Sequence, residues 1–204
     1  MEQQTTNSTQ ITPVETVKRI LNVTESLGLF YNAANGHHSL RALQQVPLNS
    51  VLHTFGAREF VQRPTYLSVQ VDDNKHILLA PEFLQYINHS CEPNTFFDTK
   101  TGQVLALRSI APNEEITFFY PSTEWSMTQP FTCFCGAANC LGQIQGAAHL
   151  SKKALAKYRF AEHIQRRLVR SVGEYWKTTR ELALDAMTEC LRATLLPTIP
   201  KESF

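Results

Sequence analysis

Asn88-His89-Ser90-Cys91, with Asn94 shortly after it, places amide, imidazole, hydroxyl and thiol groups close together in the chain. Two further pieces follow: the aromatic run Phe118-Phe119-Tyr120, and then a cysteine cluster made of Cys133, Cys135 and Cys140. Side chains of these types hydrogen-bond, titrate and bind metal ions. Their combination indicates a functional site that is assembled from separated parts of the chain.

The composition is that of a folded protein. The chain has 204 residues, which is enough for one proper core and a small satellite module. Hydrophobic residues make up 43% of the sequence and charged residues 18%, so disorder is disfavoured. The formal net charge of +1 provides no broad positive field for a polyanion, which argues against direct nucleic-acid binding. We expect the partner to be a protein or a small molecule.

Residues 1–13 are predicted to form a flexible tail. The first ten residues are polar and contain no basic region that leads into an apolar stretch, so they do not form a signal peptide. No later stretch is long and apolar enough to span a bilayer. We therefore expect an intracellular protein, nuclear or cytoplasmic, without membrane contact.

Short strands and turns are predicted for most of the segment from Leu27 to Tyr120. The segments Leu67–Val71 and His76–Leu79 flank a polar turn and predict a hairpin. Two more strands are expected at Val104–Leu107 and Ile116–Tyr120. The apolar positions of Val14–Val23 suit a short helix and a strand equally well.

The last third of the chain has a different pattern. A loop that contains the cysteine cluster ends near Gly146, and apolar residues from Leu150 to Val172 then recur at helical spacing among many lysines and arginines. A second helix is expected from about Thr178 to Leu195. The basic face of the first helix suits nucleic-acid contact or attraction to an acidic surface, but a solvated helix face is the favoured interpretation.

The spacing Cys133-x-Cys135-x4-Cys140 predicts a metal site. A Cys-x-Cys pair is poorly placed to form a disulfide with itself, and structural zinc takes four sulfur or nitrogen ligands in a tetrahedron. Gly136 and Gly142 give the loop backbone freedom beside the ligands. Inert buried thiols and an iron–sulfur cluster are the alternatives. The distant Cys190 is expected to be a thiol buried among apolar helix residues.

In order and spacing these motifs resemble the SET domain, a methyltransferase family, over roughly Thr24 to Gly146. The resemblance implies a mainly β fold with some α, made of several small curled sheets with a pseudoknot, a post-SET zinc loop and C-terminal helices. It divides the chain into a SET domain at residues 14–121, a post-SET zinc loop at 122–146 and a helical segment at 147–204. The knotted threading is what brings residues near positions 89 and 120 to one site.

The resemblance also implies a lysine Nε-methyltransferase that uses S-adenosylmethionine and acts on a protein lysine. Asn88 and His89 would then bind the cofactor, as would Leu27 and Gly28 in the segment Ser26–Phe30, which stands where the family has a Gly-x-Gly turn. Tyr120 would contact the cofactor and line the point of methyl transfer. Cys91 would complete a structural zinc site.

Phe118 stands at the family's product-specificity position, and a phenylalanine there implies di- or trimethylation. Aromatic walls suit a methylated ammonium. Phe118, Tyr86 and Trp125 are the candidates for such walls, although a plain core role is equally consistent with Tyr86 and Trp125.

Three positions depart from the family pattern. Gln85 stands where an arginine is frequent, Asn113 replaces a glycine, and Phe119 replaces an acidic residue before Tyr120. Because of these departures, a non-catalytic SET-like binding module is an alternative function. The segment between Phe55 and Tyr66 is brief, which leaves a second alternative function, a methyltransferase of a small-molecule amine such as free lysine.

Overall fold

The structure is a computed structural model that describes residues 16–171 and 184–185. The expected tail at residues 1–13 and Cys190 lie outside the described residues, as does nearly all of the expected second helix. No helix within the described ranges combines the length and the apolar character that crossing a membrane requires.

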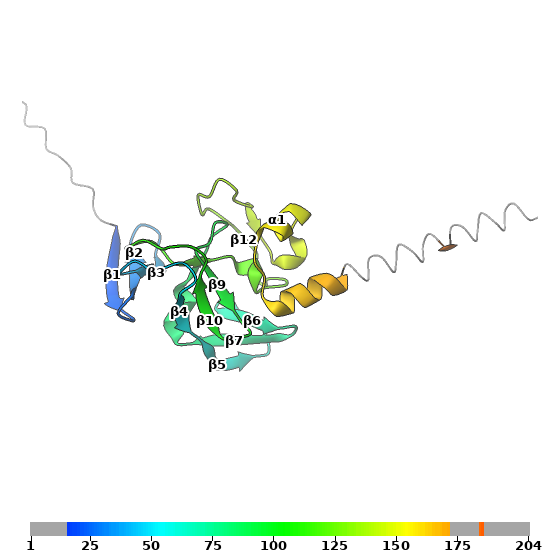
Figure 1. The fold of residues 1–204 in the computed structure, drawn as a ribbon, viewed down its shortest axis with the longest axis horizontal. Coiled ribbons are helices and arrows are strands. Elements are labelled where there is room, and N and C mark those ends of the chain that lie inside the picture. The colour runs from blue at the N-terminus through cyan, green and yellow to red at the C-terminus, as the bar shows by residue number, and fades with distance from the viewer. Residues whose placement is uncertain (1–15, 172–183, 186–204) are drawn as a thin grey trace, which may run out of the picture.

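The described chain is mainly β, with its strands arranged in four small sheets and a few short helices (Figure 1). The strands are β1 Val17–Asn22, β2 Leu27–Asn32, β3 His37–Ala42, β4 Val51–Thr54, β5 Gly56–Val61, β6 Ser68–Asp72, β7 Lys75–Ala80, β8 Asn88–His89, β9 Thr95–Asp98, β10 Gln103–Ala106, β11 Thr117–Phe118, β12 Phe131–Thr132 and β13 Gln143–Ile144. The helices are the 3-10 turns η1 Glu82–Tyr86, η2 Tyr120–Ser122 and η3 Ala147–His149, the α-helix α1 Lys152–Lys157, and helical residues 162–171. The predicted fold class of several small sheets with few helices is confirmed.

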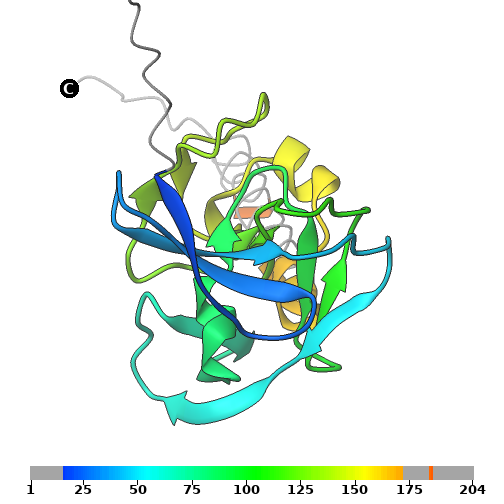
Figure 2. The same cartoon turned by 90° about the vertical axis from the view of Figure 1, so that its left-hand side faces the viewer.

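The first sheet is an antiparallel meander in the order β1-β2-β3, which crosses the front of the molecule in Figure 2. The ambiguous segment Val14–Val23 therefore contains a strand, β1. Gly28 was expected in a turn but lies inside β2, paired with Arg41. A side chain at Gly28 would come within 2.9 Å of the Leu43 Cδ2 atom, so close packing explains the glycine.

The second sheet, in the order β5-β7-β6, contains the predicted hairpin. Val69 pairs with Ile77 across β6 and β7, and the turn lies at residues 73–74. Val69, Ile77 and Leu79 are buried, as the alternation of apolar and polar residues predicts.

A five-stranded sheet in the order β4-β10-β9-β11-β8 brings the separated motifs together. The short strand β11 runs parallel to both β8 and β9, and pairs Thr117 with Asn88 and Phe118 with His89. The predicted strand Ile116–Tyr120 is shorter than expected. Tyr120 begins the 3-10 turn η2 because Pro121 follows it and cannot donate a ladder hydrogen bond.

The main core lies between the first three of these sheets. Its buried residues are Leu27, Leu29, Leu40, Ala42, Val46, Val69, Ile77, Leu79, Leu84, Ile87, Phe97, Val104, Ala106, Ile110, Ile116 and Phe118. A second, smaller cluster is built on Phe119, Ala147, Phe160 and Ile164. The C-terminal segment thus packs against Phe119, directly after β11.

The basic segment after residue 150 is broken into two helices rather than one. The backbone is extended at Tyr158, and the Ala161 N–H donates to the Ser122 carbonyl at 2.9 Å. The break allows the Tyr158 ring to stack on Phe119, with ring centroids 3.7 Å apart. This contact explains the departure at position 119, because an apolar ring there is covered by the C-terminal segment.

Some of the basic side chains of residues 162–171 form ion pairs within the chain and are not simply solvated. Arg166 contacts Asp72 at 2.7 Å and Arg170 contacts Asp73 at 2.6 Å. These ion pairs join the helix to the turn between β6 and β7. The arginines therefore have acidic partners within the chain, which weakens both functional interpretations of the basic face.

Asn113 has a φ of +64°, in the left-handed region. Glycine tolerates this conformation without strain, and asparagine is among the few other residues that adopt it regularly. Asparagine in place of glycine at this position therefore still allows the turn ahead of Glu114.

Candidate active site and metal centre

Asn88 is fixed by two hydrogen bonds from its amide nitrogen. Its Nδ2 atom donates to the His38 carbonyl at 2.9 Å and to the Glu115 carboxylate at 2.8 Å. Glu115 in turn lies 3.8 Å from the Arg41 guanidinium. The side-chain amide thus joins the first sheet to the five-stranded sheet.

His89 connects three parts of the site. Its Nδ1 atom accepts a hydrogen bond from the Tyr120 backbone N–H at 3.2 Å, and its Nε2 atom lies 3.4 Å from the Cys91 sulfur. The ring also packs edge-on against the Tyr120 ring, with centroids 5.2 Å apart. Burial lowers the pKa of His89 to about 4, so the imidazole is neutral at physiological pH.

The Tyr120 hydroxyl donates a hydrogen bond to the Ile87 carbonyl at 3.2 Å, directly before Asn88. Burial raises the pKa of Tyr120, and the nearby carboxylates of Glu115 and Glu124 raise it further. The phenol therefore keeps its proton.

A cavity of about 480 Å³ lies beside Tyr120. Residues 64–69 and residues 127–131 line it, as do Ile87 and Phe118. Its apolar surface suits the aliphatic part of a side chain. Glu124 is the one carboxylate among the described residues that line it.

Two of the three candidate aromatic walls lie elsewhere. Phe118 lines the cavity, whereas the Tyr86 ring packs on His38 with centroids 5.2 Å apart, and the Trp125 ring lies 4.7 Å below the Arg167 guanidinium. The aromatic residues that join Phe118 and Tyr120 around the cavity are Tyr66 and Phe131. The sequence contains no pattern that singles these two out.

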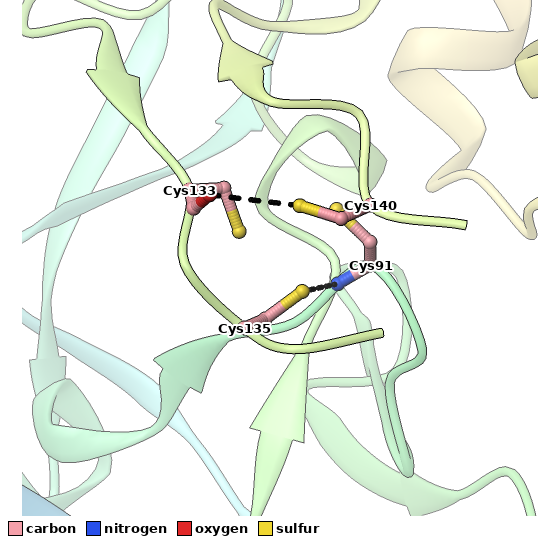
Figure 3. A group of neighbouring side chains, drawn as sticks. All are labelled: Cys91, Cys133, Cys135 and Cys140. Carbon is pink, nitrogen blue, oxygen red and sulfur yellow. Dashed lines mark hydrogen bonds between the residues drawn. The ribbon is translucent and has the colours of Figure 1, made fainter. Parts of the chain in front are cut away.

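The four cysteines meet at one point, although Cys91 is more than forty residues from the others (Figure 3). Their sulfur atoms all lie within 4.8 Å of one another. A tetrahedral zinc site with Zn–S bonds of about 2.3 Å requires sulfur atoms about 3.8 Å apart. The cluster therefore fits a zinc ion, and Cys91 takes the place that the resemblance implied.

The loop backbone supports the cluster. Gly136 and Gly142 have φ values of +74° and +73°, as expected for glycines that turn a chain around a metal site. The Leu141 N–H donates to the Cys91 sulfur at 3.4 Å. Burial raises the pKa of the Cys91 thiol to about 11. A cation among the sulfurs would favour the ionised thiolates.

The cluster is also held from outside. The Cys91 carbonyl accepts hydrogen bonds from the Tyr158 hydroxyl at 2.8 Å and from the Asn139 side chain at 2.9 Å. The Asn139 amide also donates to the Tyr158 oxygen at 3.1 Å. Tyr158 belongs to the segment after α1, so this segment contacts both the cysteine cluster and Phe119. The helical spacing of Leu150 to Val172, which includes Tyr158, gave no sign of these contacts.

Leu27 and Gly28 have less direct contact with Asn88, His89 and Tyr120. Leu27 is buried in the same core cluster as Ile87 and Phe118. The space in front of Gly28 is filled by Leu43, Phe30 and Arg19. These contacts therefore bring Asn88, His89, Tyr120 and the four cysteines together, and they join Leu27 to this group through the core.

The comparisons with known proteins agree with this arrangement. Residues 6–121 match the family model described as the SET domain. Methyltransferase flvH of Aspergillus flavus is 35% identical over 165 residues, which cover 79% of this chain and 92% of that protein. An H3 lysine-36 specific histone-lysine N-methyltransferase of Candida albicans is 35% identical over 86 residues, which cover 38% of this chain and 10% of that larger protein.

Among solved structures, the methyltransferase domain of human histone-lysine N-methyltransferase SETMAR aligns with 52% of this chain and 52% of its own length, at 17% identity and a TM-score of 0.39. The family match covers more than half of the 204 residues, and its last part contains both strands that pair at Asn88 and Thr117. The chain therefore belongs to the SET-domain methyltransferase family.

Proposed function

We propose that this protein is an S-adenosylmethionine-dependent lysine Nε-methyltransferase that acts on a protein lysine. The observation that carries the proposal is the hydrogen bond from the Tyr120 hydroxyl to the Ile87 carbonyl. It joins the phenol to the residue directly before Asn88, and both Tyr120 and Ile87 line the cavity. In methyl transfer a methyl group passes from the cofactor sulfur to the amine nitrogen. A hydroxyl oxygen and a backbone carbonyl oxygen that are held close together can stabilise the partial positive charge on that methyl group.

Methyl transfer depends mainly on alignment. S-adenosylmethionine supplies an electrophilic methyl group, and the amine attacks that carbon from the side opposite the departing sulfur. Rigid positioning of the two reactants can provide much of the acceleration. Tyr120 would orient the amine through its oxygen, and the walls of the cavity would hold the aliphatic stem. The lysine must arrive neutral, and its ordinary pKa is about 10.4, so a proton has to leave before transfer.

The residues near Tyr120 fit the cofactor chemically. Asn88 and His89 offer a fixed amide and a neutral imidazole. Leu27 and Gly28 are proposed to contact the methionine part through their backbone. The bonds that Asn88 already makes leave its amide oxygen as the group available to a ligand.

Phe118 supports the formation of di- or trimethyl-lysine. The ring lines the cavity and packs against the rings of Phe97 and Tyr120, with centroids 4.4 and 4.7 Å away. It offers no hydroxyl to hold a water beside the amine, so space is left for methyl groups that have already been added. The surrounding aromatic faces favour the methylated cation.

The metal is proposed to be a structural zinc ion bound by Cys91, Cys133, Cys135 and Cys140. Four thiolates complete a tetrahedral set and leave no place for an activated water. The ion would hold residues 122–146, the proposed post-SET loop, against the segment that contains Asn88. The proposed SET domain spans residues 14–121, and residues 147–204 are the proposed helical segment. Neither nucleic acid nor membrane is part of the proposed function.

A small-molecule amine, such as free lysine, is the second candidate acceptor. It is favoured by the relative that matches along most of both chains, which is described as a methyltransferase without a histone in its name. The histone-lysine enzyme of Candida albicans matches over a small part of its length. A cavity of about 480 Å³ has room for either a free amine or a projecting side chain.

Incubation of the purified protein with labelled S-adenosylmethionine tests the proposal and separates the two acceptors. Histones, total cell protein and free lysine are supplied in parallel reactions. Label in a protein band, located on lysine by mass spectrometry, is the expected result. Label in free lysine alone would support the second candidate. Binding of the cofactor without label in any reaction would contradict both.

A further inference from the structure

Glu124 is the one carboxylate among the described residues that line a cavity whose surface is apolar for the larger part. Its side chain is 13% exposed, and it lies on the cavity surface together with Tyr120. The backbone joins these two residues, because the Glu124 N–H donates to the Tyr120 carbonyl at 3.1 Å.

The carboxylate is held in position. Its Oε1 atom accepts a hydrogen bond from the Gln70 N–H at 2.7 Å. Its Oε2 atom lies 3.6 Å from the His76 Nε2 atom, in a contact that is ionic only when the imidazole is protonated. Its orientation is therefore set by β6 and β7, the hairpin on one side of the cavity.

No lysine or arginine is present among the described residues that line the cavity, and His37 is the basic side chain there. A positive charge that approaches a partly buried carboxylate is attracted more strongly than it would be in open water. The residues that line the cavity also include the apolar side chains of Leu67, Val69 and Met127. This combination fits a flexible aliphatic chain that ends in an ammonium group.

We infer that Glu124 is a specificity-determining residue that selects a cationic alkylamine as the acceptor. The inference rests on the proposed function and adds a residue that selects its substrate. The carboxylate attracts the charged form of the amine and excludes neutral or acidic chains of the same length. Because the same negative charge raises the pKa of a bound amine, it favours binding rather than the loss of the proton.

The test uses Glu124→Gln, which removes the charge and keeps an amide oxygen to accept from the Gln70 N–H. Glu162→Gln is the matched control, because it removes an exposed carboxylate outside this cavity. Ligand-observed NMR titration with n-butylammonium measures cation binding, and titration with 1-butanol measures the contribution of the apolar walls. Both are carried out at neutral pH and low ionic strength, where charge attraction is least screened.

We expect Glu124→Gln to weaken n-butylammonium binding by about tenfold, with 1-butanol binding unchanged and the control like the wild type. Glu124→Asp should recover part of the lost affinity. Equal n-butylammonium affinity in the wild type and Glu124→Gln would overturn the inference, and so would failure of the wild type to bind it. A shared melting temperature would exclude misfolding as the cause.

Turnover gives a separate measurement with the acceptor found by labelling. Glu124→Gln should raise KM about tenfold and leave kcat unchanged or higher, whereas a misplaced Tyr120 would lower kcat. If the wild type transfers no methyl group at all, the proposed function fails. The n-butylammonium titrations would still decide the role of Glu124.

Discussion

Phe118 stands at the position that the family resemblance connects with the number of methyl groups transferred. Its ring is in contact with Phe97 and Tyr120 and lines the cavity beside the proposed point of transfer. Side-chain size at such a position controls how many methyl groups the amine can carry, because each added methyl group displaces a water molecule or a protein atom.

We predict that Phe118→Tyr changes the product from di- or trimethyl-lysine to monomethyl-lysine. The added hydroxyl would hold a water in the space that a methylated amine needs. Mass spectrometry of the reaction products gives the distribution directly. Tyr86→Phe serves as a control because Tyr86 packs on His38 outside the cavity. An unchanged product distribution in Phe118→Tyr would contradict the assignment of this position.

His163 provides a pH prediction at the same scale. It is buried, its Nε2 atom lies 2.8 Å from the Thr123 carbonyl, and burial lowers its pKa below the ordinary value of about 6.5. The unfolded chain therefore binds a proton at a pH where the folded chain does not. Stability from this group is fully present above about pH 6.5 and is lost as the pH falls from there through the folded pKa.

Melting temperatures of the wild type and His163→Gln between neutral and mildly acidic pH would measure this effect. The wild type should lose more stability on acidification than the variant, even if the variant is less stable at neutral pH. Parallel pH profiles for the two proteins would show that His163 does not titrate as described.

At the scale of elements, the structure depends on contacts between segments that lie far apart in the sequence. The parallel pairing of β11 with β8 places Asn88 beside the strand that leads to Tyr120. The segment after α1 covers Phe119 and donates to the Cys91 carbonyl. The cysteine cluster and the C-terminal segment thus support the site from behind.

Tyr158→Phe tests this support. It removes the hydrogen bond to Cys91 and keeps the ring that stacks on Phe119. We expect a loss of about 1 kcal/mol in the free energy of unfolding, a typical value for one hydrogen bond. We also expect faster release of zinc to a chelator. Tyr31→Phe, on an exposed ring, is the control. Unchanged stability and unchanged zinc release would remove Tyr158 from this role.

The metal site leads to a prediction of stoichiometry. Wild-type protein should contain about one zinc ion per chain, and Cys140→Ser should lose most of it because three thiolates leave the tetrahedron incomplete. Cys190→Ser should retain the ion, since four other cysteines already complete the set. Elemental analysis after dialysis measures both. Zinc retained in Cys140→Ser, or lost in Cys190→Ser, would contradict the proposed ligands.

At the scale of the whole molecule, local signals in the sequence predicted local structure well. The hairpin of β6 and β7 follows from alternation around a polar turn, and the convergence of the cysteines agrees with their spacing and with the family resemblance. Glu124 could not be predicted, because nothing in its neighbours along the chain reveals that β6 and β7 hold it on a cavity wall. The break at Tyr158 was missed because helical spacing continues through it, while contacts with Phe119 and Ser122 interrupt the helix.

The central claim is that Tyr120 acts at a methyl-transfer site next to Asn88, and one paired measurement tests it most directly. Cofactor binding by calorimetry and methyl transfer from labelled S-adenosylmethionine are compared in the wild type and Tyr120→Phe, which keeps the ring and removes the hydroxyl. We predict similar cofactor affinity in both proteins and a fall in turnover of about 100-fold or more in the variant, as for other single groups that stabilise a transition state. Equal turnover in the two proteins, or no cofactor binding by the wild type, would contradict the claim.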